Sequence, residues 1–348
     1  MPASRTQQLA FAGLQTARVA FYGVHYLAAR LAARDSFGAL SKTEHPVPSL
    51  AAMARAMADL FAQDWRNVEA GLYPVPLNIL KEARRAMASI DYLRDIPKVV
   101  KRQQSRGHSE ARAKADAKKL PRYFQQNFHY QTDGYLSEDS ARIYDFQVEA
   151  LFAGTAEAMR RRAYVPVAKY LERRDPAKTV LLDIGAGTGR FLSFVKSVQP
   201  ELQATALDLS APYLARAKRA LRHAKGVTFA EAAAEAMPLK DASVDIAVSI
   251  YLFHELPPKV RAAAAKDIAR VLKPGGIFIL ADTIQYGDAP PFDGLIDVFP
   301  ELLHEPYYKT YARTDLKKLF GGLKHASDDI AYLTKISVFE KPKPKRRS

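Results

Sequence analysis

The stretch VLLDIGAGTGR, residues 180–190, decides the fold of this chain of 348 residues. Residues 180–182 form the continuous apolar run that is typical of a parallel strand buried on both faces. Apolar side chains then recur at helical spacing over residues 191–195. The three glycines therefore lie between a strand and a helix, where they permit a sharp turn and let a ligand approach the helix N-terminus. The stretch predicts a loop that binds a nucleoside cofactor.

The spacing of the glycines separates two kinds of cofactor. The dinucleotide fingerprint GxGxxG would place a third glycine at the position of Arg190, and this chain has GxGxG instead. The next apolar strand, residues 204–207, ends at Asp208. A carboxylate at that strand end can accept hydrogen bonds from ribose hydroxyls, so the pattern favours an adenosine-containing ligand.

Four segments in order, DIGAGTG, LDLS, EAMPLKDASVDIAVS and LKPGGIFILAD, resemble the motif series of class I S-adenosylmethionine-dependent methyltransferases over roughly residues 165–340. The resemblance implies an α/β fold with a doubly wound, Rossmann-like sheet and S-adenosyl-L-methionine as cofactor. The segments LFHELP and HEPYY resemble a branch broadly similar to the small-molecule methyltransferases of quinone biosynthesis.

The resemblance also implies which residues contact the cofactor. In this family the glycine loop lies beside the amino-acid part of the cofactor, and the acidic residue after the second strand holds the ribose. The chain departs from the family at Ala233, where an acidic residue often contacts the adenine amino group, so adenine recognition is expected from backbone groups nearby. The predicted contacts are Asp183, Gly185, Ala186, Gly187, Gly189, Asp208, Leu209, Ala234 and Glu235.

One histidine is the candidate catalytic residue. A methyl group on a sulfonium is already activated, so the enzyme mainly holds the acceptor in line and excludes water. A general base helps when the acceptor is a hydroxyl or a protonated amine. His254 follows the strand predicted over residues 244–250, at the edge where the acceptor is expected. The alternative is a structural histidine that bonds a backbone carbonyl or anchors the LPP turn.

Aromatic residues from two segments are the candidate acceptor contacts. The segment 121–147 and the stretch LLHEPYYKTY, residues 302–311, both mix aromatic and titratable side chains. Aromatic faces suit a sulfonium, although packing in the core explains the same residues equally well. The candidates are Tyr130, Tyr135, His304, Tyr307 and Tyr308. One histidine and one glutamate in HEP are too few for a metal, so no metal is predicted.

The chain is longer than one typical domain and is expected to have four parts. These are a helical N-terminal unit over 1–120, an aromatic-rich lid or connector over 121–164, the cofactor-binding domain over 165–340 and a basic tail over 341–348. The helical unit is expected either to cap the substrate pocket or to make a dimer contact, and the oligomeric state stays open. Within the cofactor domain, Gly275 and Gly276 are interpreted as a turn before a strand, and Asp245 as a strand cap.

Cysteine content and charge restrict the class of protein. The chain has no cysteine, which excludes disulfides, thiolate zinc sites and a cysteine nucleophile and favours a cytoplasmic setting. The net charge of +15 is concentrated in residues 1–130, with 20 Lys and Arg against 10 Asp and Glu, whereas residues 171–340 have 22 against 21. A nearly neutral cofactor domain argues against nucleic acid as the substrate.

The sequence therefore predicts an enzyme that transfers a methyl group, by in-line displacement, to a small and partly apolar or aromatic acceptor. Residues 1–34 predict an amphipathic helix that packs within the helical unit, could contact a membrane surface, and also has the composition of an organelle transit peptide. Two rival hypotheses remain. One is an RNA or protein methyltransferase that docks through the basic N-terminal unit, and the other is a non-catalytic nucleoside-binding or scaffold protein.

Overall fold

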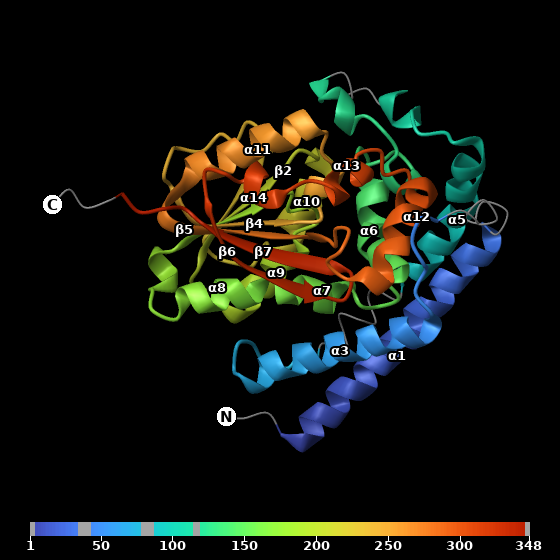
Figure 1. The fold of residues 1–348 in the computed structure, drawn as a ribbon, viewed down its shortest axis with the longest axis horizontal. Helices are drawn as coiled ribbons and strands as arrows, with labels where there is room; N and C mark the ends of the chain where they lie inside the picture. The colour runs from blue at the N-terminus through green and yellow to red at the C-terminus, as the bar shows by residue number, and fades with distance from the viewer. Residues whose placement is uncertain (1–3, 34–42, 78–86, 114–118, 345–348) are drawn as a thin grey trace. The chain divides into compact units, whose positions relative to one another are not determined.

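The computed structural model describes residues 4–33, 43–77, 87–113 and 119–344 (Figure 1). The chain divides into two compact units. The helical unit comprises Met1–Met159 and Pro291–Glu305, and the sheet unit comprises Arg160–Pro290 and Pro306–Ser348. Each unit has its own core and is described by itself.

The sheet unit is built on a seven-stranded sheet in the order β3-β2-β1-β4-β5-β7-β6. The strands are β1 (Val180–Ile184), β2 (Gln203–Asp208), β3 (Val227–Glu231), β4 (Val244–Ile250), β5 (Leu272–Thr283), β6 (Lys324–Ala331) and β7 (Thr334–Glu340). The first five are parallel, and β7 runs antiparallel to both of its neighbours. The strand order reverses between β1 and β4, which is where ligands bind in open sheets of this kind. The predicted doubly wound α/β fold is confirmed.

Helices alternate with the strands of the sheet unit. They are α8 (Tyr164–Leu171), η6 (Pro176–Lys178), α9 (Arg190–Val198), α10 (Ala211–Ala220), η7 (Phe253–Glu255), α11 (Pro258–Val271), α13 (Tyr308–Ala312) and α14 (Leu316–Leu319). In Figure 1, α8 lies below the sheet and α11 above it. Because both faces are covered, the central strands are apolar on both sides: Leu181, Ile246 and Phe278 are fully buried.

The sequence suggests that the glycine pair after Pro274 forms a turn before a strand, and the structure shows that it does not. Gly275 and Gly276 lie inside β5, where the pairing of β4 with β5 shifts register. Gly275 has φ +79°, and a Cβ on Gly276 would lie 2.8 Å from the carbonyl oxygen of Asp245. The strand therefore passes through the pair as an irregularity that only glycine fits. The predicted structural role of Asp245 is confirmed, because its carboxylate accepts a 2.9 Å hydrogen bond from the first residue of β1, Val180.

The helical unit contains the helices of the predicted N-terminal part, together with segments expected in the lid and one helix, α12, from the range expected for the cofactor domain. Its described helices are α1 (Arg5–Ala32), α3 (Leu50–Glu69), α5 (Ser89–Ser105), η2 (Glu110–Ala113), η4 (Arg122–Phe124), η5 (Phe128–Tyr130), α6 (Glu138–Leu151) and α12 (Asp293–Leu303). Two further segments, α7 (Ala156–Arg162) and η8 (Pro290–Phe292), span the points where the chain passes between units. Residues 78–86 of the helical unit predicted over 1–120 lie outside the described residues.

Local sequence explains how these helices begin. Ser4 and Gln7 form a reciprocal capping box at the start of α1, and Ser137 caps α6 by accepting from the backbone of Ser140. The core of the unit packs Tyr22 of α1 against Phe146 of α6, with ring centroids 5.2 Å apart. No helix in the described ranges is both long and apolar enough to cross a membrane.

Candidate cofactor and active site

The glycine loop after β1 has the backbone that its sequence predicts. Gly185, Gly187 and Gly189 all have positive φ, at +72°, +55° and +77°. A Cβ on Gly185 would lie 3.1 Å from Leu252, and one on Gly189 would lie 3.0 Å from Ala217, so these two glycines allow close packing. A Cβ on Gly187 would meet nothing within 4 Å. The middle of the loop thus leaves open space where a ligand can approach the backbone.

Asp208 fixes the loop from the neighbouring strand. Its Oδ2 accepts a 2.7 Å hydrogen bond from the backbone N–H of Gly187, and its Oδ1 accepts a 2.8 Å bond from that of Ser210. The register of β1 and β2 pairs Ile184 with Leu207, which aligns the two strand ends. Each carboxylate oxygen keeps a second lone pair, so Asp208 can hold the loop and also accept from a ligand hydroxyl.

Two acidic groups at this edge are held in an environment that disfavours their charge. Burial, and then the nearby charge of Asp208, raise the pKa of Asp183 to about 7, while Arg160 opposes the shift. Burial raises the pKa of Asp208 to about 6 against the lowering effect of its backbone hydrogen bonds. Such neighbours favour a ligand that brings positive charge and hydroxyl donors. The ammonium, sulfonium and ribose hydroxyls of S-adenosylmethionine fit this set of acceptors and the open face of Gly187.

The remaining predicted cofactor residues lie along the same edge of the sheet. Ala186 donates its backbone N–H to the carbonyl of Leu207 at 3.0 Å. Leu209 directly follows Asp208, whose carbonyl accepts from Ala232 at 3.1 Å and so holds the turn after β3 beside β2. That turn contains Ala234, which is buried, and Glu235, which is half-buried. The contacts of these residues with a cofactor stay predictions.

His254 lies in η7, just past the carboxyl end of β4, and faces the end of β5. Its Nδ1 lies 2.6 Å from Oδ1 of Asp282, and Oδ2 of the same carboxylate accepts a 2.8 Å bond from the backbone N–H of Phe253. Both side chains are buried. A carboxylate only accepts, so the neutral imidazole donates from Nδ1 and its Nε2 is the basic nitrogen. This is the arrangement of an oriented general base.

Arg261, which the sequence analysis did not select, holds η7 in place from α11. Its guanidinium donates to the carbonyls of Phe253 at 3.0 Å and Leu256 at 2.9 Å, and to the hydroxyl of Thr314 at 3.0 Å. The side chain is almost fully buried, and burial lowers the pKa of the guanidinium. The signal that could have found it is the helical spacing of Arg261 with Ala264, Ala265 and Ile268, which places the arginine on the buried face of α11.

Two of the predicted acceptor residues accompany the histidine. The ring of Tyr308 lies 5.7 Å from that of His254, and the carbonyl of Tyr307 accepts from Arg261 at 3.3 Å. Tyr311 lies 6.3 Å from His254, and burial raises the pKa of its hydroxyl well above the ordinary value. That hydroxyl is buried and has no hydrogen-bond partner among the described residues. It is a donor that an acceptor molecule could satisfy.

The other three predicted acceptor residues belong to the helical unit. The ring of Tyr130 lies 5.5 Å from that of His304, whose Nε2 bonds the side chain of Gln126 at 2.9 Å. Burial, and then His108, lower the pKa of His304 to about 4, so its imidazole is neutral at pH 7. Tyr135 instead stacks on Phe128 with ring centroids 5.5 Å apart. The five candidates therefore do not form one cluster within either unit.

Potential metal ligands also meet in the helical unit. Ligand atoms of Glu44, His45 and Asp297 lie within 4.8 Å of one another. His45 and Asp297 already bond each other, with Nδ1 3.1 Å from Oδ2. This hydrogen bond accounts for the closeness of His45 and Asp297, and exposed acidic groups such as Glu44 are common without a metal.

Comparison with known proteins identifies the sheet unit. Residues 182–280 match the family model described as a methyltransferase domain. The chain is 33% identical over 122 residues to a ubiquinone/menaquinone biosynthesis C-methyltransferase UbiE of Methylobacterium nodulans, covering 34% of this chain and 47% of that protein. It is 35% identical over 101 residues to a malonyl-[acyl-carrier protein] O-methyltransferase of Methylococcus capsulatus, covering 29% and 36%.

A third relative and one solved structure complete the comparison. A carboxy-S-adenosyl-L-methionine synthase of Aeromonas hydrophila is 34% identical over 123 residues, which are 34% of this chain and 49% of that protein. A methyltransferase structure from Methanosarcina mazei is 20% identical, covers 52% of this chain and 99% of its own, and has a TM-score of 0.42. The chain spans less than half the length of these three curated relatives. The chain therefore contains a class I S-adenosylmethionine-dependent methyltransferase domain.

Proposed function

We propose that this protein transfers a methyl group from S-adenosylmethionine to a small, partly apolar or aromatic acceptor by in-line displacement. The observation that carries the proposal is the contact between Asp208 and Gly187, which joins a ribose-binding carboxylate to an open glycine loop. The oriented imidazole of His254 stands at the end of β4, the strand next to β1. Cofactor and acceptor groups are thus expected on adjacent strand ends, as methyl transfer requires.

Each residue has a definite task in this proposal. The bound cofactor supplies a methyl group already activated on a sulfonium. Asp208 accepts from the ribose hydroxyls, and Asp183 offers negative charge beside the amino-acid part of the cofactor. His254 takes a proton at Nε2 from the acceptor, while Asp282 keeps the ring in the tautomer that has Nε2 basic. Water is excluded by burial of the histidine and its neighbours.

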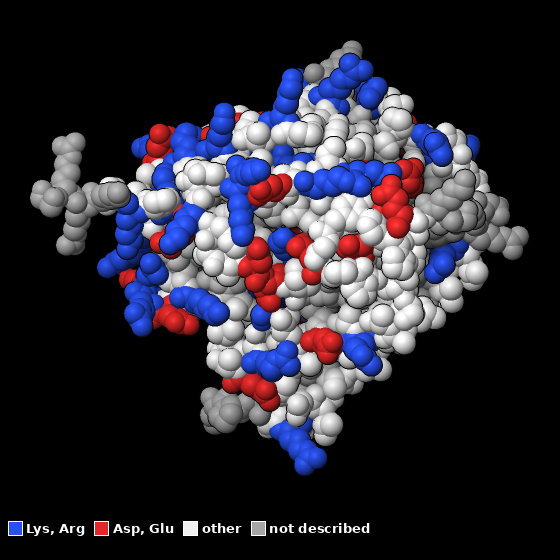
Figure 2. Space-filling model, in the orientation of Figure 1, with Lys and Arg blue, Asp and Glu red and all other residues white. Residues whose placement is uncertain are grey.

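The class of acceptor rests on three observations. Tyr308 and the unpartnered hydroxyl of Tyr311 supply aromatic surface and one donor beside His254. Basic and acidic side chains are interspersed over the visible face of the sheet unit (Figure 2), so this face offers no continuous basic surface for phosphates. Two of the relatives are named as a ubiquinone/menaquinone biosynthesis C-methyltransferase and as a malonyl-[acyl-carrier protein] O-methyltransferase. These observations support a small molecule over RNA and leave the methylated atom to the assay.

The first experiment tests the cofactor. Calorimetric titration with S-adenosylhomocysteine should give saturable binding, and NADH should neither bind nor compete. A panel of hydroquinones, phenols and short carboxylic acids is then screened for release of S-adenosylhomocysteine from S-adenosylmethionine. Binding of neither nucleoside would reject the proposal and favour a non-catalytic role for the domain.

Exposed apolar residues on α1 support a second candidate property, contact with a membrane surface that carries an apolar acceptor. Leu9, Val24, Leu27 and Leu31 are each more than half exposed, and α1 contains no acidic residue. An exposed apolar helix face on a helix that carries arginines and no acidic residue suits an anionic lipid surface. Sedimentation with vesicles containing phosphatidylglycerol should bring down the protein, and Leu27→Glu with Leu31→Glu should abolish this. Equal sedimentation of wild type and double variant would reject the contact.

A further inference from the structure

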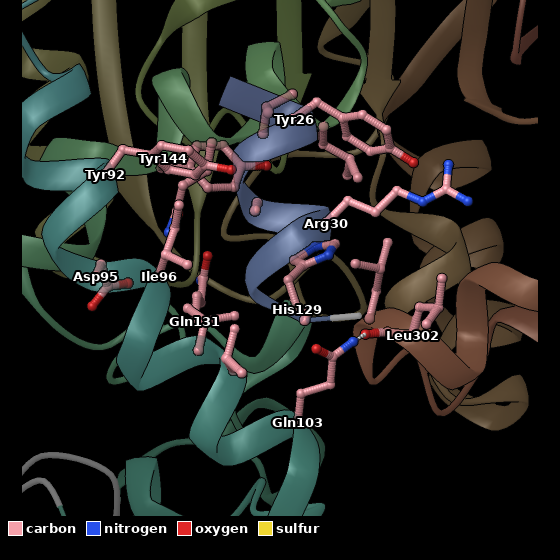
Figure 3. Close-up of a pocket in the computed structure, with 18 residues that line it drawn as sticks. Tyr26, Arg30, Tyr92, Asp95, Ile96, Gln103, His129, Gln131, Tyr144 and Leu302 are labelled. Carbon is pink, nitrogen blue, oxygen red and sulfur yellow. Dashed lines mark hydrogen bonds between the residues drawn. The ribbon is translucent and has the colours of Figure 1, made fainter. Parts of the chain in front are cut away.

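The helical unit contains a half-open cavity that the methyltransferase motifs do not explain. Its walls come from α1, α5, α6 and α12, together with the segment around His129 (Figure 3). The side chain of Gln103 on α5 closes one side by donating to the carbonyl of Leu302 on α12 at 2.9 Å. All of the lining residues belong to the helical unit, so the cavity exists within one compact unit.

The size of the cavity restricts its ligand. Its volume is about 160 Å³. An apolar cavity of about 150 Å³ can hold one benzene molecule. The cavity therefore suits one ring with short substituents.

The walls are apolar and aromatic. Tyr92 and Tyr144 lie on one side in Figure 3, and aliphatic side chains such as Ile96 and Val148 fill much of the rest. The guanidinium of Arg30 points away from the two tyrosines in the same view. Burial, and then the charge of Tyr26, raise the pKa of Tyr92 to about 12, so its hydroxyl stays neutral. A neutral aromatic wall favours an uncharged ring over an ion.

Two lining residues carry buried acceptor atoms that lack a donor. Oδ1 of Asp95 accepts from the hydroxyl of Thr132 at 2.6 Å, and Thr132 in turn accepts from Arg102 at 3.0 Å. Oδ2 of Asp95 and Oε1 of Gln147 have no hydrogen-bond partner among the described residues. Asp95 is only 7% exposed, and leaving a buried acceptor unpaired costs free energy. A ligand hydroxyl or amine would remove that cost.

We propose that the helical unit binds an uncharged, single-ring molecule that bears a hydroxyl or amine, with its ring between Tyr92, Ile96 and Val148 and its donor on Asp95 or Gln147. The geometry that supports this is the ring-sized, mostly apolar space together with two buried acceptor atoms that lack a hydrogen-bond donor. The proposal goes beyond methyl transfer, because it does not require the cofactor or the sheet unit to act.

The experiment uses three probes on the full chain without cofactor. Binding of p-cresol, toluene and octanoate is followed by saturation-transfer NMR and by calorimetry. We expect saturable binding of p-cresol, at least fivefold weaker binding of toluene because it has no donor, and no binding of octanoate. Lack of saturable binding by both ring probes, or binding of octanoate alone, would overturn the proposal.

Matched variants locate the site. Ile96→Phe fills the cavity and should weaken both ring probes at least tenfold, whereas Ile90→Phe makes the same change at an exposed position of the same helix and should leave both affinities unchanged. Asp95→Asn should weaken the binding of p-cresol at least fivefold and leave that of toluene unchanged, with Asp91→Asn as its control on α5.

Thermal unfolding and circular dichroism identify the variants that fold. Folded Ile96→Phe with unchanged affinity would place binding elsewhere and reject the cavity, and unchanged p-cresol affinity in Asp95→Asn together with Gln147→Leu would reject the donor contact.

Discussion

Nδ1 of His254 and Oδ1 of Asp282 lie 2.6 Å apart at the ends of two adjacent strands, so the carboxylate fixes the orientation of the imidazole. We expect His254→Ala to lower turnover about 10²–10⁴-fold, the usual contribution of a general base, while S-adenosylhomocysteine affinity stays nearly unchanged. Asp282→Asn should also lower turnover, because an amide can present its N–H to Nδ1 and reverse the tautomer.

The measurement is S-adenosylhomocysteine release with an acceptor found by the screen, paired with calorimetry on each variant. His223→Ala, at an exposed position of the same unit, is the control and should behave as wild type. If His254→Ala unfolds, His254→Gln serves in its place. Full turnover by a folded variant would return His254 to a structural role.

The ribose role of Asp208 predicts a change in cofactor affinity. Asp208→Ala removes the carboxylate that bonds Gly187 and Ser210, and should weaken S-adenosylhomocysteine by about 1.5–3 kcal/mol, the scale of hydrogen bonds to a charged group. Calorimetric titration measures this directly. Asp241→Asn changes an exposed acidic residue of the same unit and should have no effect. Wild-type affinity in folded Asp208→Ala would refute the ribose contact.

The raised pKa values near the loop predict a pH dependence of stability. Asp183 and Asp208, with pKa values of about 7 and about 6, hold protons in the folded protein that the unfolded chain releases near its ordinary pKa of about 3.9. Folding therefore binds protons over this window, and their contribution to the free energy of unfolding falls as pH rises from about 4 to 7. The pKa of His304 is lowered to about 4, so its contribution to the free energy of unfolding rises as pH rises from about 4 to 6.5.

A variant separates these opposing contributions. The Tm of Asp183→Asn minus that of wild type should increase as pH rises from 5 to 8. The reason is that the wild-type carboxyl becomes charged in a buried position, which destabilises wild type alone. Differential scanning calorimetry of both proteins across this range gives the difference in Tm. The same comparison with Asp241→Asn should give a difference that does not vary with pH. A constant difference for Asp183→Asn would contradict the buried-charge interpretation.

The features that the sequence predicts are those encoded locally. The strand and loop of residues 180–190 follow from an apolar run and from glycines whose positive φ the structure confirms. The place of His254 follows from counting past one strand, whereas its partner Asp282 lies on another strand and becomes its partner only through the β4–β5 pairing. The same limit explains why His304 and Tyr307, three positions apart, belong to different units. Such relations depend on long-range packing, which periodicity does not encode.

Arg261 shows how a residue without a motif can control the site, and it gives the last prediction. Its guanidinium bonds η7 at Phe253 and Leu256 from inside the core, so the geometry of His254 depends on it. Arg261→Lys retains one charge and loses the planar set of donors, which leaves buried carbonyls unpaired. We expect the free energy of unfolding in urea to fall by about 2–4 kcal/mol.

The functional consequence distinguishes positioning from stability alone. In folded Arg261→Lys, turnover should fall and the NMR signals of the His254 ring should shift, because η7 loses the hydrogen bonds that hold it. The affinity for S-adenosylhomocysteine should be kept, because Arg261 does not contact the loop that Asp208 holds. Arg219→Lys on the exposed face of α10 is the matched control. If the variant is less stable but keeps both its turnover and the wild-type His254 signals, Arg261 only supports the core, and the orientation of the histidine rests on Asp282 alone.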